Sequence, residues 1–481
     1  KFYEKLMKLR NFLLLLVLTF GFISISADSV FAQLPNSNMT LLANRNNHAP
    51  TSGNRYSALW GYTAPNNREY AIVGCYNGVA FYDVTDSANI IEADFHPGGT
   101  TGWREMKTYS HYAYIVTDQS AGVGLTIIDL QYLPDSIHFV RNWTFSGFTL
   151  GHTISQEGPY LYINGGNAST GGGVRIVDLT SNPELPVLRG QWITEYIHDC
   201  RVLRDTIWGA NIYDAGNGGT GSIYIINAAN KDNPVTINSW VNNPTPGPHN
   251  IAITGDRRFA LTTDEIPQFS LPRQLKIWNI QNLSNVTLAA TWRPTGVGDS
   301  SIVHNVEIYG NYALIAHYTC GIRLVNITNP AAPVEVAWYD TYPSNNRHTY
   351  NGCWGVYMFP SGKIIGSDMA TGLYVLKPTV PLVGFTEPEV NTPNSFELKQ
   401  NYPNPFNPST TIEFSIKKAS FVTLKVYDAI GRQVGLLADE FRNAGSYSIS
   451  YDAGRLSSGV YYYSLSTNDG FSETKKMVLT K

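Results

Sequence analysis

The chain has 481 residues, of which 43% are hydrophobic, 12% are aromatic and only 15% are charged. With 42 glycines and 30 tyrosines, it has the turn-rich composition that is typical of exported all-β proteins. The net charge of -3 and the lack of a basic stripe argue against a nucleic-acid partner and against an anionic membrane surface.

The N-terminal stretch predicts a signal peptide over residues 1–32. Met7 to Ala32 reads MKLRNFLLLLVLTFGFISISADSVFA, with basic residues, an apolar core and a small-residue cleavage site before Gln33. A membrane anchor is the alternative, but the apolar run is shorter than the roughly 20 residues that a spanning helix needs. We therefore expect export and a mature chain without a transmembrane segment.

Residues 33–378 repeat one pattern. A clear copy is GIRLVNITNPAAPVEVAWYD at 321–340, in which an alternating apolar run, an Asn-Pro turn and a second run predict a β-hairpin. Further copies occupy 78–95, 124–143, 173–192, 221–240 and 274–292, with a truncated copy at 371–378. The copies are about 50 residues apart, which is the spacing of four-stranded propeller blades.

Two more strand-like runs precede each hairpin, as HNVEIYG and YALIAHY do at 304–318. Each unit then has four strands, and the seven units predict a seven-bladed β-propeller, an all-β fold. The last unit lacks its outer strand. Residues 38–45, NMTLLANR, resemble that strand, so we expect the N-terminal segment to close the ring and to leave no open edge.

The repeat stops after Lys377. Residues 379–395 are rich in Pro, Thr and Asn without a period, which indicates a linker. Residues 396–481 then contain the strand-like runs TIEFSI, FVTLKVYD, YSISYD, GVYYYSLS and KKMVLT. These runs predict a small immunoglobulin-like β-sandwich.

The four cysteines are Cys75, Cys200, Cys320 and Cys353, and none belongs to a Cys-x-x-Cys pair. This spacing supports neither a structural zinc site nor a thioredoxin-type motif. Export permits disulfides, and Cys320 and Cys353 are expected on one face, so they are the first pair to test. Four unpaired buried thiols are the alternative.

Histidines recur at one register of the repeats. When the innermost strands are aligned, their starting positions are Trp60, Trp103, His152, His198, His249, His304 and Trp354. In a propeller this position lies nearest the central channel, at the mouth where the connections between blades cross. Imidazoles favour Zn, Cu, Fe or Ni over Ca. We expect the four histidines to converge on a transition-metal ion such as Zn, three as ligands and the fourth beside them.

The second strands of the units end at the same mouth, at Asp118, Asn164, Asn211, Asp264 with Glu265, His317 and Asp368. We expect carboxylates there to complete the coordination or to fix the tautomers of the histidines. The tryptophans at positions 60, 103 and 354 either pack in the core or form an aromatic wall for a sugar or another flat ligand. A purely structural alternative is that the polar residues satisfy buried backbone groups of the loops.

Several stretches carry family resemblances. The hairpins with IIDL, RIVDL and RLVNITNPAAPVEV resemble LVIVD-repeat propellers, and LWGYTAPNNREYAIVG and GCWGVYMFPSGKIIGSDMATGLYVL resemble the choice-of-anchor B family of secreted bacterial propellers. The tail with NYPNPFNPSTTIEFSI, VYDAIGRQV and KKMVL is similar to the C-terminal sorting domain of type IX secretion substrates of Bacteroidetes and related bacteria. These resemblances imply export by the type IX machinery to the outer-membrane surface or the medium. They supply no catalytic residues.

Three functions are compatible with the sequence. The leading hypothesis is a non-enzymatic surface protein that binds an extracellular ligand at the histidine-lined mouth, where the ligand is a metal ion, a polysaccharide or a protein. The first alternative is a metal-dependent extracellular hydrolase or lyase, in which the ion activates water. The second alternative is a cell-surface interaction scaffold without a small-ligand site.

Overall fold

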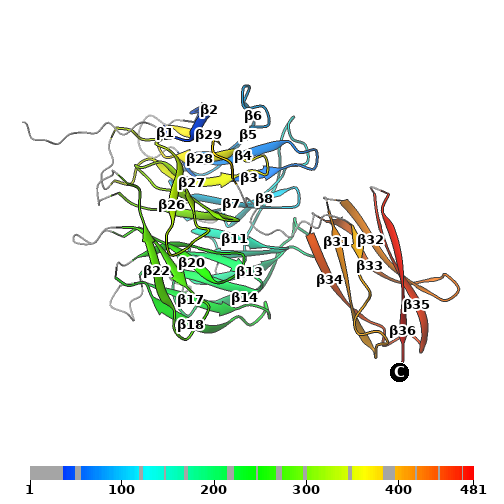
Figure 1. Ribbon diagram of the computed structural model, residues 1–481. Helices are drawn as coiled ribbons and strands as arrows, with labels where there is room; N and C mark the ends of the chain where they lie inside the picture. The colour runs from blue at the N-terminus through cyan, green and yellow to red at the C-terminus, as the bar shows by residue number, and fades with distance from the viewer. Residues whose placement is uncertain are drawn as a thin grey trace, which may run out of the picture. The chain divides into compact units, whose positions relative to one another are not determined.

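The computed structural model describes residues 36–481 except 49–55, 119–122, 146–147, 167–171, 214–220, 245–246, 267–272, 296–300, 345–348, 383–395, 418–419, 443–444 and 469. The predicted signal peptide and most of the predicted linker lie outside the described residues. The regular structure of the described part consists of β-strands (Figure 1). Within these residues, no helix is long and apolar enough to cross a membrane.

The described residues of 56–378 form seven antiparallel sheets, in which the strands pair in chain order. The first sheet contains β3 (Tyr56–Thr63), β4 (Glu69–Cys75), β5 (Gly78–Asp83) and β6 (Ile91–Pro97), and the second contains β7 (Arg104–Tyr109), β8 (Tyr112–Thr117), β9 (Leu125–Asp129) and β10 (His138–Trp143). The third sheet contains β11 (Thr153–Glu157), β12 (Tyr160–Asn164), β13 (Val174–Asp178) and β14 (Val187–Trp192). The fourth sheet contains β15 (Asp199–Leu203), β16 (Thr206–Asn211), β17 (Ser222–Asn227) and β18 (Val235–Val241). The fifth sheet contains β19 (Pro248–Ile253), β20 (Phe259–Asp264), β21 (Leu275–Asn279) and β22 (Thr287–Trp292). The sixth sheet contains β23 (Asn305–Tyr309), β24 (Tyr312–Ala316), β25 (Ile322–Asn326) and β26 (Val334–Tyr339). The seventh sheet contains β27 (Cys353–Met358), β28 (Ile364–Asp368) and β29 (Gly372–Pro378).

The sheets follow one another around a ring. The first strands of the sheets, β3, β7, β11, β15, β19, β23 and β27, contact one another in this order, and β27 contacts β3. A closed ring of four-stranded antiparallel sheets is a β-propeller, with these strands innermost. The predicted all-β propeller fold is confirmed.

The N-terminal segment completes the last sheet. Strand β2 (Met39–Arg45) pairs with β29, and Met39 lies opposite Pro378. The short strand β1 (Asn36–Ser37) pairs with β26 of the preceding sheet. The predicted closure is therefore confirmed, and it joins the start of the described chain to the end of the repeat region without an open edge.

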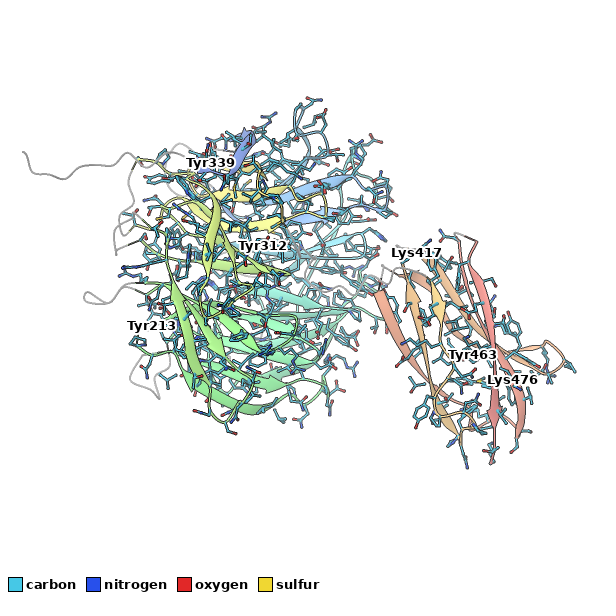
Figure 2. All side chains as sticks on the ribbon, viewed as in Figure 1. Tyr213, Tyr312, Tyr339, Lys417, Tyr463 and Lys476 are labelled. Carbon is cyan, nitrogen blue, oxygen red and sulfur yellow. The ribbon has the colours of Figure 1, made fainter. Side chains whose placement is uncertain are left out.

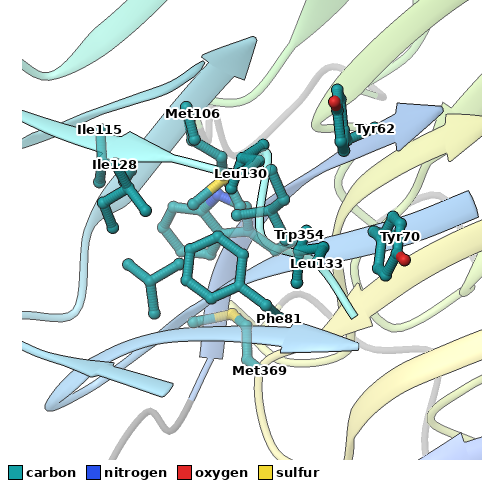
Figure 3. Packing of buried hydrophobic residues seen from close by; sticks show 14 of the residues in the cluster. Tyr62, Tyr70, Phe81, Met106, Ile115, Ile128, Leu130, Leu133, Trp354 and Met369 are labelled. Atoms are coloured by element: carbon teal, nitrogen blue, oxygen red, sulfur yellow. The ribbon is translucent and has the colours of Figure 1, made fainter. Parts of the chain in front are cut away.

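The hydrophobic core is divided into clusters between neighbouring sheets. The cluster in Figure 3 joins Tyr70 and Phe81 of the first sheet to Ile115 of the second sheet and to Trp354 of the seventh sheet. Each sheet therefore buries both faces. This explains why inner strands such as EYAIVGC (Glu69–Cys75) are buried along their whole length and read as nearly continuous apolar runs.

Two further sheets, one of three strands and one of four, form the C-terminal part of the chain. One contains β30 (Glu397–Leu398), β31 (Ser409–Ile416) and β34 (Gly445–Asp452), and the other contains β33 (Gln433–Arg442), β32 (Ser420–Asp428), β35 (Gly459–Thr467) and β36 (Ser472–Leu479). Both sheets contribute to one core, which includes Phe414 from the first and Tyr463 from the second. This arrangement is a β-sandwich, as the sequence predicts.

The four cysteines are free and buried. Cys320 and Cys353, the first pair to test, are therefore not bonded to each other in the structure, in agreement with the alternative of four unpaired thiols. Burial raises the pKa of Cys75 and of Cys200 to about 12, so these thiols stay protonated at neutral pH.

The closure of the ring is testable at its first buried side chain. Met39 of β2 is buried in the core cluster that joins the sixth and seventh sheets, whereas its neighbour Thr40 is exposed. Met39→Ala should therefore lower the free energy of unfolding by about 2–4 kcal/mol, because it leaves a cavity at the closing strand. Thr40→Ala, the matched control, should change it by less than about 0.5 kcal/mol in denaturant titrations. Equal effects of the two substitutions would contradict the closure.

Candidate functional site

The backbone places the histidines at one end of the innermost strands. The backbone N–H of His198 donates to the carbonyl of Ala210, and that of His304 donates to the carbonyl of Ala316, so each histidine extends the pairing with the second strand of its own sheet. His249 lies within β19 itself. The side chains then meet along an arc, with ring centroids of successive histidines 4.3, 4.3 and 4.0 Å apart from His152 to His304.

Each of three imidazoles is hydrogen-bonded to the backbone of the next sheet. Nδ1 of His198 lies 3.3 Å from the carbonyl oxygen of His249, and Nδ1 of His249 lies 3.2 Å from that of His304. Nδ1 of His304 lies 2.6 Å from the carbonyl oxygen of Trp354. A carbonyl oxygen only accepts hydrogen bonds, so Nδ1 carries the proton in all three rings. In the neutral imidazole, Nε2 then keeps its lone pair.

Burial keeps these three rings neutral. It lowers the pKa of His198 well below its ordinary value, and it lowers the pKa of His249 and of His304 to about 3. The removal of the rings from water disfavours the imidazolium form. At neutral pH the three Nε2 atoms are therefore unprotonated, which is the state that binds metal ions.

His152 is in a different state. Its Nδ1 lies 2.8 Å from Oδ2 of Asp118, and its Nε2 lies 2.9 Å from Nε2 of His198. Because the His198 nitrogen has no proton to give, His152 is the donor of this bond, and it also donates to the carboxylate. Burial opposes the charged form, but the hydrogen bond and charge of Asp118 raise the pKa of His152 above its ordinary value. The contact with Asp118 therefore favours the imidazolium form of His152.

A carboxylate faces the neutral imidazoles. Glu265 follows β20 directly, and its Oε2 lies 3.8 Å from Nε2 of His249, while its Oε1 lies 4.0 Å from Nε2 of His304. The hydroxyl of Tyr318 donates to Oε1 at 2.8 Å and holds the carboxylate in place.

One set of side chains within the described residues has the spacing of a metal site. His198, His249 and Glu265 each offer one ligand atom, and these atoms all lie within 4.8 Å of one another. Ligand bonds of about 2.0–2.2 Å place two ligand atoms of one Zn ion roughly 3–4 Å apart, so a small closure of the three side chains would suffice. His304 and His152 flank this set.

Further charged groups line the interior next to the histidines. Nζ of Lys107 lies 3.1 Å from a carboxylate oxygen of Glu105, and the amide of Asn250 donates to Asp199 at 2.6 Å. Burial raises the pKa of Glu105 to about 7 and also raises the pKa of Asp199, and the two carboxyl groups act on each other and on His152. In both groups the main cause is burial, which disfavours the ionised carboxylate.

A second ion pair crosses the channel. Arg201 of β15 and Glu307 of β23 meet at 2.7 Å, although the fifth sheet lies between theirs in the ring. Burial opposes the charge of Arg201, but Glu307 and Asp199 raise its pKa. The carboxyl groups of residues 105, 118, 199, 265 and 307 thus gather near Lys107, Arg201 and His152, and Glu105 is partly protonated near neutral pH because its pKa is about 7.

Three other residues expected at the mouth have different surroundings. The carboxylate of Asp264 is buried beside Nζ of Lys276, at 3.1 Å, and the amide of Asn242. Asp368 accepts a hydrogen bond from the hydroxyl of Thr341 and from the backbone N–H groups of residues 370 and 371, so it fixes a turn. His317 is fully buried in the sixth sheet, and neither ring nitrogen has a hydrogen-bond partner among the described residues.

The three tryptophans pack against the protein, and Trp60 lies within β3, opposite Ile72, rather than at the start of its strand as the alignment of the repeats predicts. Trp354 belongs to the core cluster of Figure 3, and Trp60 and Trp103 pack against that cluster. Nζ of Lys107 lies 3.8 Å from the ring centroid of Trp60. Trp354 contacts the arc through its carbonyl, which accepts a hydrogen bond from His304, and through its ring, whose centroid lies 4.9 Å from that of His304.

The sequence reasoning did not find Tyr318, Glu105 or Asp199. A usable signal was present for Asp199, because a polar residue follows each of the last three histidines, in HDC, HNI and HNV. In the structure these positions link neighbouring inner strands, since the carbonyl oxygen of the Asn250 side chain accepts the N–H of Val306. Tyr318 follows His317 directly, but only the fold brings it to Glu265.

Comparison with known proteins identifies two parts of the chain. Residues 301–341 match the family model described as LVIVD repeat, and residues 400–480 match that described as secretion system C-terminal sorting domain. The chain carries an LVIVD repeat and a C-terminal sorting domain. Both resemblances seen in the sequence are thereby confirmed. The choice-of-anchor B resemblance is compatible with these matches and stays a prediction.

Solved structures resemble the propeller. A chain of hydrazine synthase from Kuenenia stuttgartiensis is 10% identical, with a TM-score of 0.51 over 70% of this chain and 100% of that chain. The WD40 domain of Pan2 from Neurospora crassa is also 10% identical, with a TM-score of 0.46 over 73% of this chain and 98% of that chain. At this identity the first likeness shows the fold alone. No curated protein matches the chain.

The state of the buried histidines predicts a pH dependence of stability. Burial, and then the charge of Arg323, lower the pKa of His317 from 6.5 to about 3. Between these values the unfolded chain binds a proton that the folded chain does not bind, so stability is lost as the pH falls from 6.5 towards 3. His317→Gln should remove up to about 1.4 kcal/mol per pH unit from this dependence.

The measurement is denaturant unfolding of the wild type and the variant at several pH values in the presence of a chelator. His138→Gln is the matched control, because His138 is exposed on β10. If His317→Gln and the wild type lost stability with the same slope below pH 6.5, the proposed charge state would be wrong.

Proposed function

We propose that the protein is exported by the type IX system and that its propeller binds a divalent transition-metal ion at the histidine-lined mouth. The sorting domain at 400–480 indicates type IX secretion to the cell surface or the extracellular space. The propeller then acts as the displayed part, over residues 33–378. Residues 379–395 are the linker and residues 396–481 are the sorting sandwich in this proposal.

One observation carries the metal proposal. Three successive Nδ1–H groups are bonded to backbone carbonyls, which fixes their rings and leaves each Nε2 unprotonated. The Nε2 of His198 accepts a hydrogen bond from His152, and an ion bound at this nitrogen would replace that bond. Ligand histidines in metal proteins are oriented by the same kind of hydrogen bond on the other nitrogen. Two of these rings, at His198 and His249, lie within reach of Glu265. Nitrogen donors with one carboxylate suit Zn and its neighbours rather than Ca or Mg.

The surrounding charge supports a cation. Five carboxyl groups, at residues 105, 118, 199, 265 and 307, gather near the mouth, and burial raises the pKa of Glu105 to about 7. A bound dication would stabilise the ionised forms of these carboxyl groups and would bring the pKa values of both Glu105 and Asp199 closer to their ordinary values. Without these nearby carboxyl groups, a bound ion would be stabilised only by its bonds to the ligand atoms.

Three ligands leave a coordination position for a water molecule or an external ligand. This is where a displayed protein would hold part of an extracellular partner. The His152–Asp118 pair beside His198 favours a second candidate function, a metal-dependent hydrolase or lyase, because an imidazole beside a metal-bound water can exchange a proton with it. The third candidate, a scaffold without a small-ligand site, requires that no ion binds.

Metal binding is tested by equilibrium dialysis of the full chain against Zn²⁺, followed by elemental analysis. We expect about one ion per chain. His249→Ala should weaken binding by at least about 100-fold, since it removes a ligand rather than an outer partner. His138→Ala removes an exposed imidazole of β10 and should leave binding unchanged. Absence of bound Zn²⁺ in the folded wild type, or equal binding by the two variants, would contradict the proposal.

Export is tested by deletion of residues 396–481 in a bacterium that has the type IX machinery. The propeller and the sandwich have separate hydrophobic cores, so the shortened chain should fold and remain in the periplasm. Surface labelling and cell fractionation measure the outcome. Surface display of the shortened chain at the level of the full chain would show that the sandwich does not direct export.

A further inference from the structure

The C-terminal sandwich presents two large apolar side chains almost entirely to solvent. Tyr402 is 82% exposed and Ile430 is 86% exposed, whereas Leu436, the next in this part of the chain, is 51% exposed. Single exposed apolar residues are normal on protein surfaces, so exposure alone decides nothing. These two side chains differ from other exposed apolar residues in two respects: they lie at the same end of the sandwich, and hydrogen-bonded loops hold both of them.

Both residues lie at the same end of the sandwich. Ile430 is in the turn that follows β32, and Asp428 at the end of β32 pairs with Tyr461 near the start of β35. The start of β35 in turn pairs with the end of β36, where Gly459 lies opposite Leu479. The loop that contains Tyr402 reaches the same place, because the N–H of Phe406 donates to the carbonyl of Val478.

This end holds the C-terminus and is opposite the end at which the chain enters the sandwich. Strand β30 pairs with the far end of β31, where Glu397 lies opposite Ser415. Lys417, which follows β31, is at that far end in Figure 2, whereas Figure 1 marks the C-terminus at the other end. The end with Tyr402 and Ile430 is called the distal end below.

The loop at 401–408 fixes Tyr402 rigidly. Its backbone N–H and carbonyl both bond to Thr411 at 2.9 Å, and the buried side chain of Asn401 donates to the carbonyl of Pro403 and to the hydroxyl of Thr410. Phe406 anchors the other side of the loop in the core. The loop therefore holds the Tyr402 ring outside the sandwich without any contribution from the ring itself.

The turn at 428–432 fixes Ile430 in a similar way. Oδ1 of Asp428 accepts the backbone N–H groups of Ile430 and Arg432, and Oδ2 accepts Nε of Arg432 at 3.0 Å. Gly431 has a φ of +81°, a conformation that favours glycine. The charges of Asp428 and Arg432 offset each other. The turn therefore presents the apolar side chain of Ile430 to solvent without a net charge beside it.

We propose that the distal end, through Tyr402 and Ile430, is the surface that docks onto a protein of the type IX export machinery. The matched sorting domain contains both residues, and sorting requires that some surface of it be recognised. Two apolar side chains that their loops hold in place at the distal end suit insertion into apolar pockets of a partner, with little ordering cost on binding. The proposal rests on the proposed export function, and it names the residues that are recognised.

The test uses the full chain in a bacterium with the type IX machinery. The double variant Tyr402→Ala with Ile430→Ala should lower the surface-exposed fraction at least tenfold, with accumulation in the periplasm. The matched control is Phe421→Ala with Leu436→Ala, which removes two exposed apolar side chains away from the distal end. It should be displayed like the wild type. The conservative double variant Tyr402→Phe with Ile430→Leu should also be displayed.

Melting curves of the purified full-length variants show whether the sandwich stays folded. Wild-type display of the alanine double variant, or equal loss in the Phe421 and Leu436 control, would overturn the docking surface. Loss of display in the conservative variant with an unchanged melting curve would also contradict it. Retention of the chain that lacks 396–481, together with normal display of the alanine double variant, would refute only this inference. Normal display of the chain that lacks 396–481 and also of the alanine double variant would refute the export function itself.

Discussion

The hydrogen bond from an imidazole Nδ1–H to a backbone carbonyl of the next sheet is the interaction on which the mouth of the propeller depends. It occurs three times in succession, from His198 to His249, from His249 to His304 and from His304 to Trp354. Each bond joins two neighbouring innermost strands, and each satisfies a carbonyl that is buried at the channel. The carbonyl of His304 also accepts the hydroxyl of Thr263, which strengthens the same junction.

Because of this bond, the histidines can have a structural role and a functional role at the same time. One ring nitrogen satisfies the backbone, as the structural alternative requires, and the other keeps a lone pair, as a metal site requires. Because burial holds the pKa of His249 and His304 at about 3, the second nitrogen stays unprotonated across the physiological range. Glu265 and the buried carboxyl groups beside the channel supply the negative charge that a dication needs.

Much of the fold follows from the sequence, because the hairpin repeats and their spacing predict strands that pair locally. The closing strand at Met39–Arg45 was recognisable because it resembles the strand that the last unit lacks. The register of the innermost strands also pointed to the histidines. These predictions need only the period of the chain and the alternation of its side chains.

The surroundings of single side chains were harder to predict. Asp264 and Glu265 are neighbours, and only the fold decides that the first is buried beside Lys276 while the second faces the imidazoles. The register that places His304 at the mouth also places Trp354 there. The indole of Trp354 nevertheless packs into the core, and the backbone carbonyl of Trp354 accepts the hydrogen bond from His304. Contacts such as Tyr318 with Glu265 join residues 53 positions apart, and no local pattern reveals them.

The tautomer of the histidines tests this account most directly. ¹⁵N NMR of the metal-free protein, labelled at histidine and assigned by single substitutions, distinguishes a protonated Nδ1 from a protonated Nε2. The account predicts that His198, His249 and His304 carry the proton on Nδ1 and remain neutral at about pH 5. Protonation on Nε2 in these rings, or titration near the ordinary pKa of 6.5, would contradict it.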